Sequence, residues 1–127
     1  MCDATTLPIC LHNGVFGAAT ATKPPQSAIK VGTTRLFLLE GKASACRIYG
    51  PFVATAPPGR DLQPALFAGR YREQVLVRAL PPLRSVSLDA LVAAGTVPRR
   101  VPSTLPPEMV ERLLAALQAQ GQAVRRP

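Results

Sequence analysis

The chain has 127 residues, of which 47% are hydrophobic and 17% are charged. This composition fits one globular domain and excludes a globally disordered chain. Fifteen Lys and Arg face seven Asp and Glu, a formal net charge of +8, which favours a polyanionic partner, although excess arginine can also serve solubility alone.

Three cysteines and one histidine make an ordinary zinc site improbable. Cys10 and His12 are too close in the chain for a zinc half-site, and no second half is present. We therefore expect no metal or other cofactor, and reduced, partly buried thiols. No apolar run approaches the ~18 residues of a membrane span, and the N-terminal residues lack a secretory pattern, so we expect a cytoplasmic protein.

The first predicted elements are a short helical turn at 7–11 and a loop at 18–30, where two adjacent prolines disfavour helix and central strand. A strand is expected at 35–40. Its residues 36–39 are apolar on both faces, which suits either a central strand or a strand covered by a helix.

A second strand is expected at 45–56, with a bulge or sharp bend at Gly50-Pro51 because glycine weakens a strand and proline lacks a donor. Simple alternation places Ile48 and Phe52 on one face and Tyr49 on the other. A loop at 56–73 follows.

A third strand is predicted at 74–80, ended by Pro81-Pro82. Ser87 is a candidate cap for a helix at 88–94. The clearest helix is at 107–120, with two prolines at its start and one apolar stripe. These elements predict one domain over 1–121 and a frayed tail at 122–127.

Taken in order, several motifs resemble those of the DCD family, which belongs to the PUA-like group together with EVE and YTH domains. They are the Phe-Gly pair at 16–17, the glycine at 32 before the Leu-Phe-Leu at 36–38, the IYGPFVA segment at 48–54, the QVLVR segment at 74–78, and the Leu-rich helix at 108–117.

This resemblance implies an α+β fold, a PUA-like curved mixed β-barrel of five to six strands flanked by short helices. In many PUA-like relatives it implies binding of RNA or of a modified base. The chain has no tryptophan, so a base-reading tryptophan cage of the YTH type is impossible.

We therefore predict a non-catalytic nucleic-acid-binding module for RNA or for single-stranded or modified nucleic acid. Arginines would contact phosphates, and a tyrosine would stack on a base. The candidate residues are Arg47, Tyr49, Arg60, Arg70, Tyr71, Arg72 and Arg78. A plainer interpretation keeps the phenylalanines in the core and has the arginines extend from its rim into solvent.

Catalysis is not expected, because His12 is the only histidine and Cys46 has no histidine near it in sequence. One alternative is a protein-interaction module, in which the apolar stripe of the last helix or an exposed strand edge binds an acidic or apolar partner segment. A small-molecule site in the barrel is a third possibility. We expect a monomer or a weak dimer.

Overall fold

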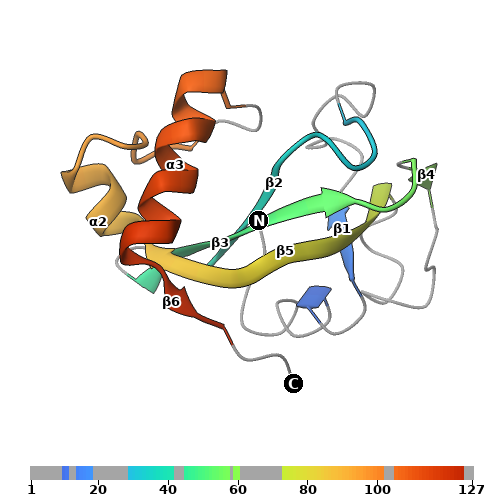
Figure 1. Cartoon of the computed structure of the whole chain (residues 1–127), viewed down its shortest axis with the longest axis horizontal. Helices are drawn as coiled ribbons and strands as arrows, with labels where there is room; N and C mark the ends of the chain where they lie inside the picture. The colour runs from blue at the N-terminus through green and yellow to red at the C-terminus, as the bar shows by residue number, and fades with distance from the viewer. Residues whose placement is uncertain are drawn as a thin grey trace.

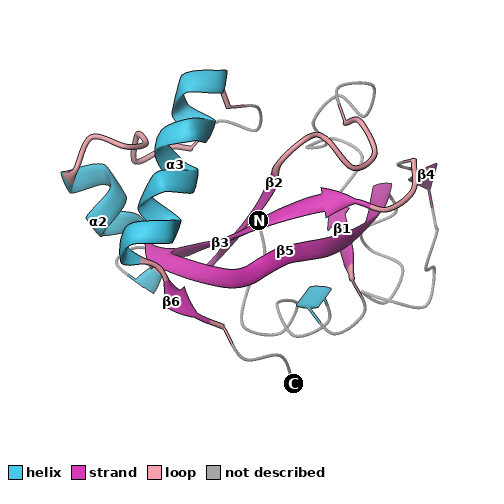
Figure 2. Cartoon of the chain, in the orientation of Figure 1, coloured by secondary structure: helices cyan, strands magenta, loops and turns pink. Residues whose placement is uncertain are grey.

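The computed structural model describes residues 10–11, 14–18, 29–41, 45–57, 59–60, 73–101 and 105–124. These residues form a mixed α+β fold with an antiparallel sheet and two helices (Figures 1 and 2). The strands are β1 (Val15–Ala18), β2 (Leu36–Glu40), β3 (Arg47–Ala54), β4 (Gly59–Arg60), β5 (Glu73–Ser87) and β6 (Gln122–Ala123), and the helices are α2 (Leu88–Ala93) and α3 (Pro107–Gln120).

The sheet is open. Its strand order is β1-β5-β3-β2, and β4 and β6 both pair with β5. Within the described part of the chain no pairing joins β1 to β2, so the expected barrel closure is not found. The reason lies in β5, which is long enough to pair with β3 on one side and with β1 and β6 on the other, so that the sheet lengthens along β5 instead of curling back to β2.

The predicted third strand does not end at Pro81-Pro82. Strand β5 continues to Ser87, and the proline pair lies where its ladder with β3 is interrupted. The register passes from Gly50 opposite Arg84 to Phe52 opposite Ala79, which leaves Pro51 facing the unpaired β5 segment 80–83. Because proline has no N–H, this interruption leaves few backbone donors without a hydrogen-bond partner. Strand β5 can therefore continue beyond it.

The predicted bend at Gly50-Pro51 is confirmed as this register shift, and it changes which side chains share a face. Tyr49 and Phe52 lie in the same buried cluster, whereas Ile48 lies in the other one. The alternation expected for an unbroken strand is therefore wrong across the bend, since β3 has one residue more than β2 between Tyr49 and Phe52, which reverses the faces after Gly50.

Two buried clusters stabilise the fold. We call the first the N-terminal cluster; it consists of Cys10, Leu11, Val15, Leu38, Tyr49, Phe52, Ala54, Val75, Val77 and Leu83. The second, the helix cluster, consists of Cys46, Ile48, Val86, Leu88, Leu91, Val97, Leu113, Ala116 and Leu117. Helices α2 and α3 lie at one end of the sheet, and β3 and β5 extend beyond them (Figure 1).

Strand β2 contributes to both clusters, although it is an edge strand of the described sheet. Leu36 and Leu38 pack with the N-terminal cluster, and Phe37 and Leu39 pack with the helix cluster. Of the two predicted settings for this apolar segment, the strand covered by a helix is the one observed. The Phe37 ring lies so close to Gly50 that a Cβ there would be 2.7 Å from its Cδ1.

The last helix is confirmed at Pro107–Gln120, with Pro107 in its first turn. Beyond it, Gln122 and Ala123 form β6 opposite Ser85 and Arg84, so the beginning of the expected frayed tail belongs to the sheet. Helix α2 also begins where expected, but Ser87 makes no side-chain capping hydrogen bond. Of the expected turn at 7–11, the structure describes only Cys10 and Leu11, which are helical.

Candidate nucleic-acid interface

Four of the seven candidate residues cannot be placed by their side chains. Arg70, Tyr71 and Arg72 lie outside the described residues. For Arg60 only the backbone is described, in β4, where it pairs with Glu73.

Tyr49 is part of the core. It belongs to the N-terminal cluster, with 9% of its surface exposed. Stacking on a nucleobase requires an exposed ring face, so we leave Tyr49 out of the interface. Phe52 is buried as well, and its ring meets that of Phe16 edge to face at 4.9 Å. Over the part of the chain that is described, Val31 is the one large hydrophobic side chain that is exposed, so this surface offers no aromatic platform.

Arg47 has a structural environment. Its Nε donates to Ser85 Oγ at 3.0 Å, and its Nη2 donates to Ser85 O at 3.1 Å and to Gln122 Oε1 at 3.3 Å. The half-buried guanidinium thus connects β3, β5 and β6. This role of Arg47 was not predicted, because residues 122–127 were expected to be a frayed tail and the partner Gln122 lies in β6.

Arg78 is exposed and opposite Val53 in the β3–β5 ladder. Its neighbours Val77 and Ala79 pack with the N-terminal cluster, so strand alternation directs Arg78 to the other side of β5. Val53 beside it is 1% exposed.

Arg35 is at the same end of the sheet. Leu36 pairs with Phe52, which places Arg35 beside Val53 in the antiparallel register. Because Leu36 packs with the N-terminal cluster, strand alternation directs Arg35 to the face of Arg78. Its Nη1 donates to Thr33 O at 2.8 Å, and the side chain is exposed.

Lys30, which is also exposed, lies shortly before Arg35 in the chain. The turn that follows it is held against the end of β3 by a hydrogen bond from Gly32 N to Ala54 O at 3.0 Å. We call Lys30, Arg35 and Arg78 the distal basic patch. The acidic side chains that are described lie elsewhere, at the end of β2 and on the two helices: Glu40, Asp89, Glu108 and Glu111. Glu73 is at the start of β5, the strand that carries Arg78, and its backbone pairs with that of Arg60.

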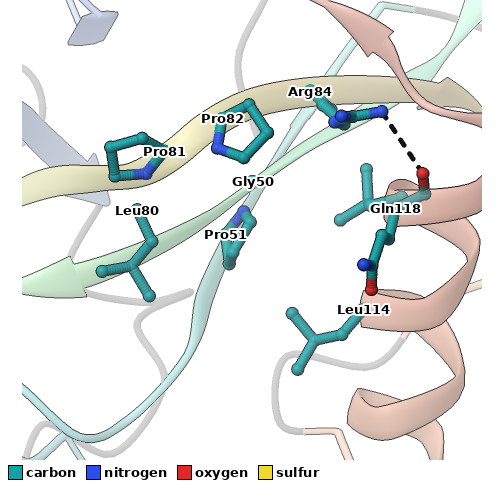
Figure 3. Close-up of a pocket in the computed structure, with 9 residues that line it drawn as sticks. Gly50, Pro51, Leu80, Pro81, Pro82, Arg84, Leu114 and Gln118 are labelled. Atoms are coloured by element: carbon teal, nitrogen blue, oxygen red, sulfur yellow. Dashed lines mark hydrogen bonds between the residues drawn. The ribbon is translucent and has the colours of Figure 1, made fainter.

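A groove of about 310 Å³ lies between the interrupted ladder and α3 (Figure 3). It is lined by Gly50, Pro51, Leu80, Pro81, Pro82, Arg84, Leu114, Leu117 and Gln118. Arg84 Nη1 donates to Gln118 O at 3.3 Å, which ties the β5 wall of the groove to the α3 wall. This groove was not predicted from the sequence, because Pro81-Pro82 was expected to end a strand.

A second pair of adjacent arginines, Arg99 and Arg100, is partly neutralised. Arg99 Nη1 donates to Asp89 Oδ1 in an exposed ion pair. Arg100 is exposed beside it. This pair contributes less free positive charge than its sequence suggests.

Neither described thiol is suited to nucleophilic chemistry. Cys10 and Cys46 are both buried and unpaired with each other. Burial raises the pKa of the Cys10 thiol to about 11. Burial, with smaller contributions from Glu40 and Asp89, also raises the pKa of Cys46. A raised pKa lowers the thiolate fraction, and the thiolate is the nucleophile.

We expect alkylation of both thiols by iodoacetamide to be slow in the folded protein at neutral pH. A pKa near 11 for Cys10 leaves about a hundredfold less thiolate than an unperturbed cysteine has. Peptide mass spectrometry with and without urea measures each site separately. The pKa values of both thiols are higher in the folded protein than in the unfolded chain. Their contribution to the free energy of unfolding should therefore be fully present below the unfolded pKa and be lost as the pH rises through the folded pKa. Fast labelling of Cys46 without urea would contradict the structural assignment.

Among the residues with a described structure, no group of three or more His, Cys, Asp or Glu could hold a metal ion. No helix in that part of the chain is long and apolar enough to cross a membrane.

Comparison with known proteins adds no assignment. No family model, no curated protein and no solved structure matches the chain.

Proposed function

We propose that the protein is a non-catalytic module that binds RNA or another single-stranded nucleic acid on the distal basic patch. The observation that carries this proposal is the placement of Arg35 and Arg78. Both are exposed. Arg78 is opposite Val53 in the β3–β5 ladder, and Arg35 immediately precedes Leu36, which pairs with Phe52 next to Val53. Neither makes a described ion pair that would neutralise it.

Guanidinium groups in this position suit phosphate oxygens, which accept two parallel hydrogen bonds from one arginine. Two such groups on either side of β3 favour an extended polyanionic chain over a single small anion. Since no exposed ring is described on this surface, affinity comes mainly from phosphate contacts. Such contacts position the chain and carry little base preference.

The resemblance of residues 48–54 and 74–78 to the DCD and PUA-like pattern supports an RNA ligand. Both segments belong to strands at the patch, since β3 supplies Val53 and β5 supplies Arg78. PUA-like ancestry is accordingly part of this proposal, with an open sheet in place of the expected barrel. Arg70, Tyr71 and Arg72 remain candidate contacts.

The double substitution Arg35→Gln with Arg78→Gln tests the proposal. We expect at least about a hundredfold loss of affinity for a fluorescein-labelled oligouridine, since each of the two charged contacts contributes on the order of 1.5–3 kcal/mol. The slope of log affinity against log salt should become about 1.4 less steep, at about 0.7 for each lost phosphate contact on a single strand. Fluorescence anisotropy at several salt concentrations measures both quantities.

The matched control is Arg99→Gln with Arg100→Gln, which removes the same formal charge far from the patch. Equal losses in the two double variants would show that binding follows net charge alone, and the patch would no longer be the site.

A further inference from the structure

The groove beside α3 is built by sequence features that the proposed nucleic-acid site does not use. Its floor is the ladder interruption at Pro51 and Pro81-Pro82. Prolines there present ring carbons and no N–H donors, which gives an apolar floor without unsatisfied donors. Leu80 on one side and Leu114 on the other add aliphatic walls (Figure 3).

One cation stands in this apolar setting. Arg84 is half-buried, and its guanidinium makes one described hydrogen bond, to the backbone oxygen of Gln118. A guanidinium has five N–H donors, so most remain available to a ligand. No carboxylate in the described residues pairs with it. A guanidinium with spare donors can pair with a carboxylate through charge-assisted hydrogen bonds.

The third element is the Gln118 side chain. It is exposed on α3 and lines the groove, and Figure 3 shows its amide on the groove wall, between Arg84 and Leu114. An amide of this kind can both donate to and accept from the backbone of an extended peptide. The groove therefore offers an apolar floor, an amide wall and a cation within one small volume.

We propose that this groove is a second binding site, which takes an extended peptide segment of a partner protein. An apolar side chain of the partner fills the space between Pro51, Leu80 and Leu114. A neighbouring Glu or Asp side chain pairs with Arg84, and the peptide backbone bonds Gln118.

Charge and lining together favour this occupant over a nucleotide. The lining is aliphatic and proline-rich, with no aromatic ring for a base to stack on. At about 310 Å³, the groove is at the small end of the range for ligand pockets, which suits one or two side chains. The net charge of +8 favours an acidic partner over a basic one.

The test uses fluorescein-labelled peptides and fluorescence anisotropy. The probe alternates glutamate and leucine. Three comparison peptides replace leucine by serine, glutamate by glutamine, or glutamate by lysine. The protein variants are Arg84→Gln, Leu114→Ser and Gln118→Ala, with Arg100→Gln as the charge-matched control. Circular dichroism shows whether each variant is folded, and the exposed Gln118 variant keeps the test valid if Leu114→Ser unfolds.

The expected result is binding of the glutamate–leucine peptide alone among the four. Arg84→Gln should weaken it about tenfold, the lower end for a charge-assisted bond, while Arg100→Gln leaves it unchanged. Binding should also survive Arg35→Gln with Arg78→Gln, and unlabelled oligouridine should not displace the peptide.

Two outcomes overturn the peptide proposal. If the glutamate–serine peptide binds equally well, the attraction is one of charge alone. If Arg84→Gln changes nothing for the peptide but weakens oligouridine binding, the groove belongs to the nucleic-acid site. Loss of oligouridine binding only in the Arg35 and Arg78 double variant leaves both proposals standing as separate sites.

Discussion

Leu113→Ala is expected to lower the free energy of unfolding by about 3–4 kcal/mol, within the range for truncating a fully buried leucine. Leu113 is 0% exposed and belongs to the helix cluster, with Ile48 from β3 and Leu91 from α2. Its removal leaves a cavity where α3, α2 and the sheet meet, and a close-packed interior relaxes only partly around such a cavity.

Urea denaturation followed by circular dichroism measures this change. Glu111→Ala, on the exposed side of the same helix, is the control and should change stability by less than about 0.5 kcal/mol. A Leu113→Ala cost close to that of the control would mean that α3 does not pack on the sheet as described.

Gly121→Ala is expected to cost about 3 kcal/mol, the upper part of the range for overpacking. A Cβ at Gly121 would lie 2.3 Å from Leu117 O and 2.8 Å from Arg84 Cβ. The closer clash is with backbone, which no side-chain rotation relieves. The same Leu117 carbonyl accepts the hydrogen bond from Gly121 N at 2.9 Å, so the turn from α3 into β6 must open.

Gly95→Ala is the matched comparison. Gly95 has a positive φ of +73°, and a Cβ there meets no atom within 4 Å. Its substitution should cost only the backbone strain of the left-handed region, about 1–2 kcal/mol. Thermal unfolding of both variants ranks them. A smaller loss for Gly121→Ala than for Gly95→Ala would contradict the close approach of α3, β5 and β6.

Local sequence patterns were sufficient to predict the features that depend on residues close together in the chain. Helix α3 follows from its proline start and apolar stripe, and it begins at Pro107 as predicted. The irregularity at Gly50-Pro51 follows from the missing donor and the missing side chain.

The remaining features depend on partners distant in sequence. Strand β5 can continue through Pro81-Pro82 because β3 is irregular at Pro51, directly opposite. The sequence around Pro81-Pro82 does not show this. The burial of Tyr49 depends on the reversal of faces at the bend, and the role of Arg47 depends on β6 returning to Ser85 and Gln122. The environments of Tyr49 and Arg47 could not be derived from their own segment alone. Tyr49 joins a cluster supplied by several elements, and the partners of Arg47 lie in β5 and β6.

The distal basic patch was predicted only in part. Arg78 was a candidate because it is one of the arginines that flank the loop between the second and third predicted strands. Arg35 was not among the candidate residues, and only the pairing of Leu36 with Phe52 indicates that it lies next to Val53. Charge composition led to the hypothesis of a polyanionic partner, and the sheet register places the arginines on which we propose that it binds.

The most direct test of the central claim is a salt titration of oligonucleotide binding by the purified protein, followed by fluorescence anisotropy. The ligands are single-stranded RNA, single-stranded DNA and duplex DNA. The account predicts affinity for a single strand that remains near about micromolar at ~0.15 M salt, with a linear dependence of log affinity on log salt. Binding that is equal for all three ligands at low salt and absent at ~0.15 M salt would contradict it, because the +8 charge would then act only as a general attraction.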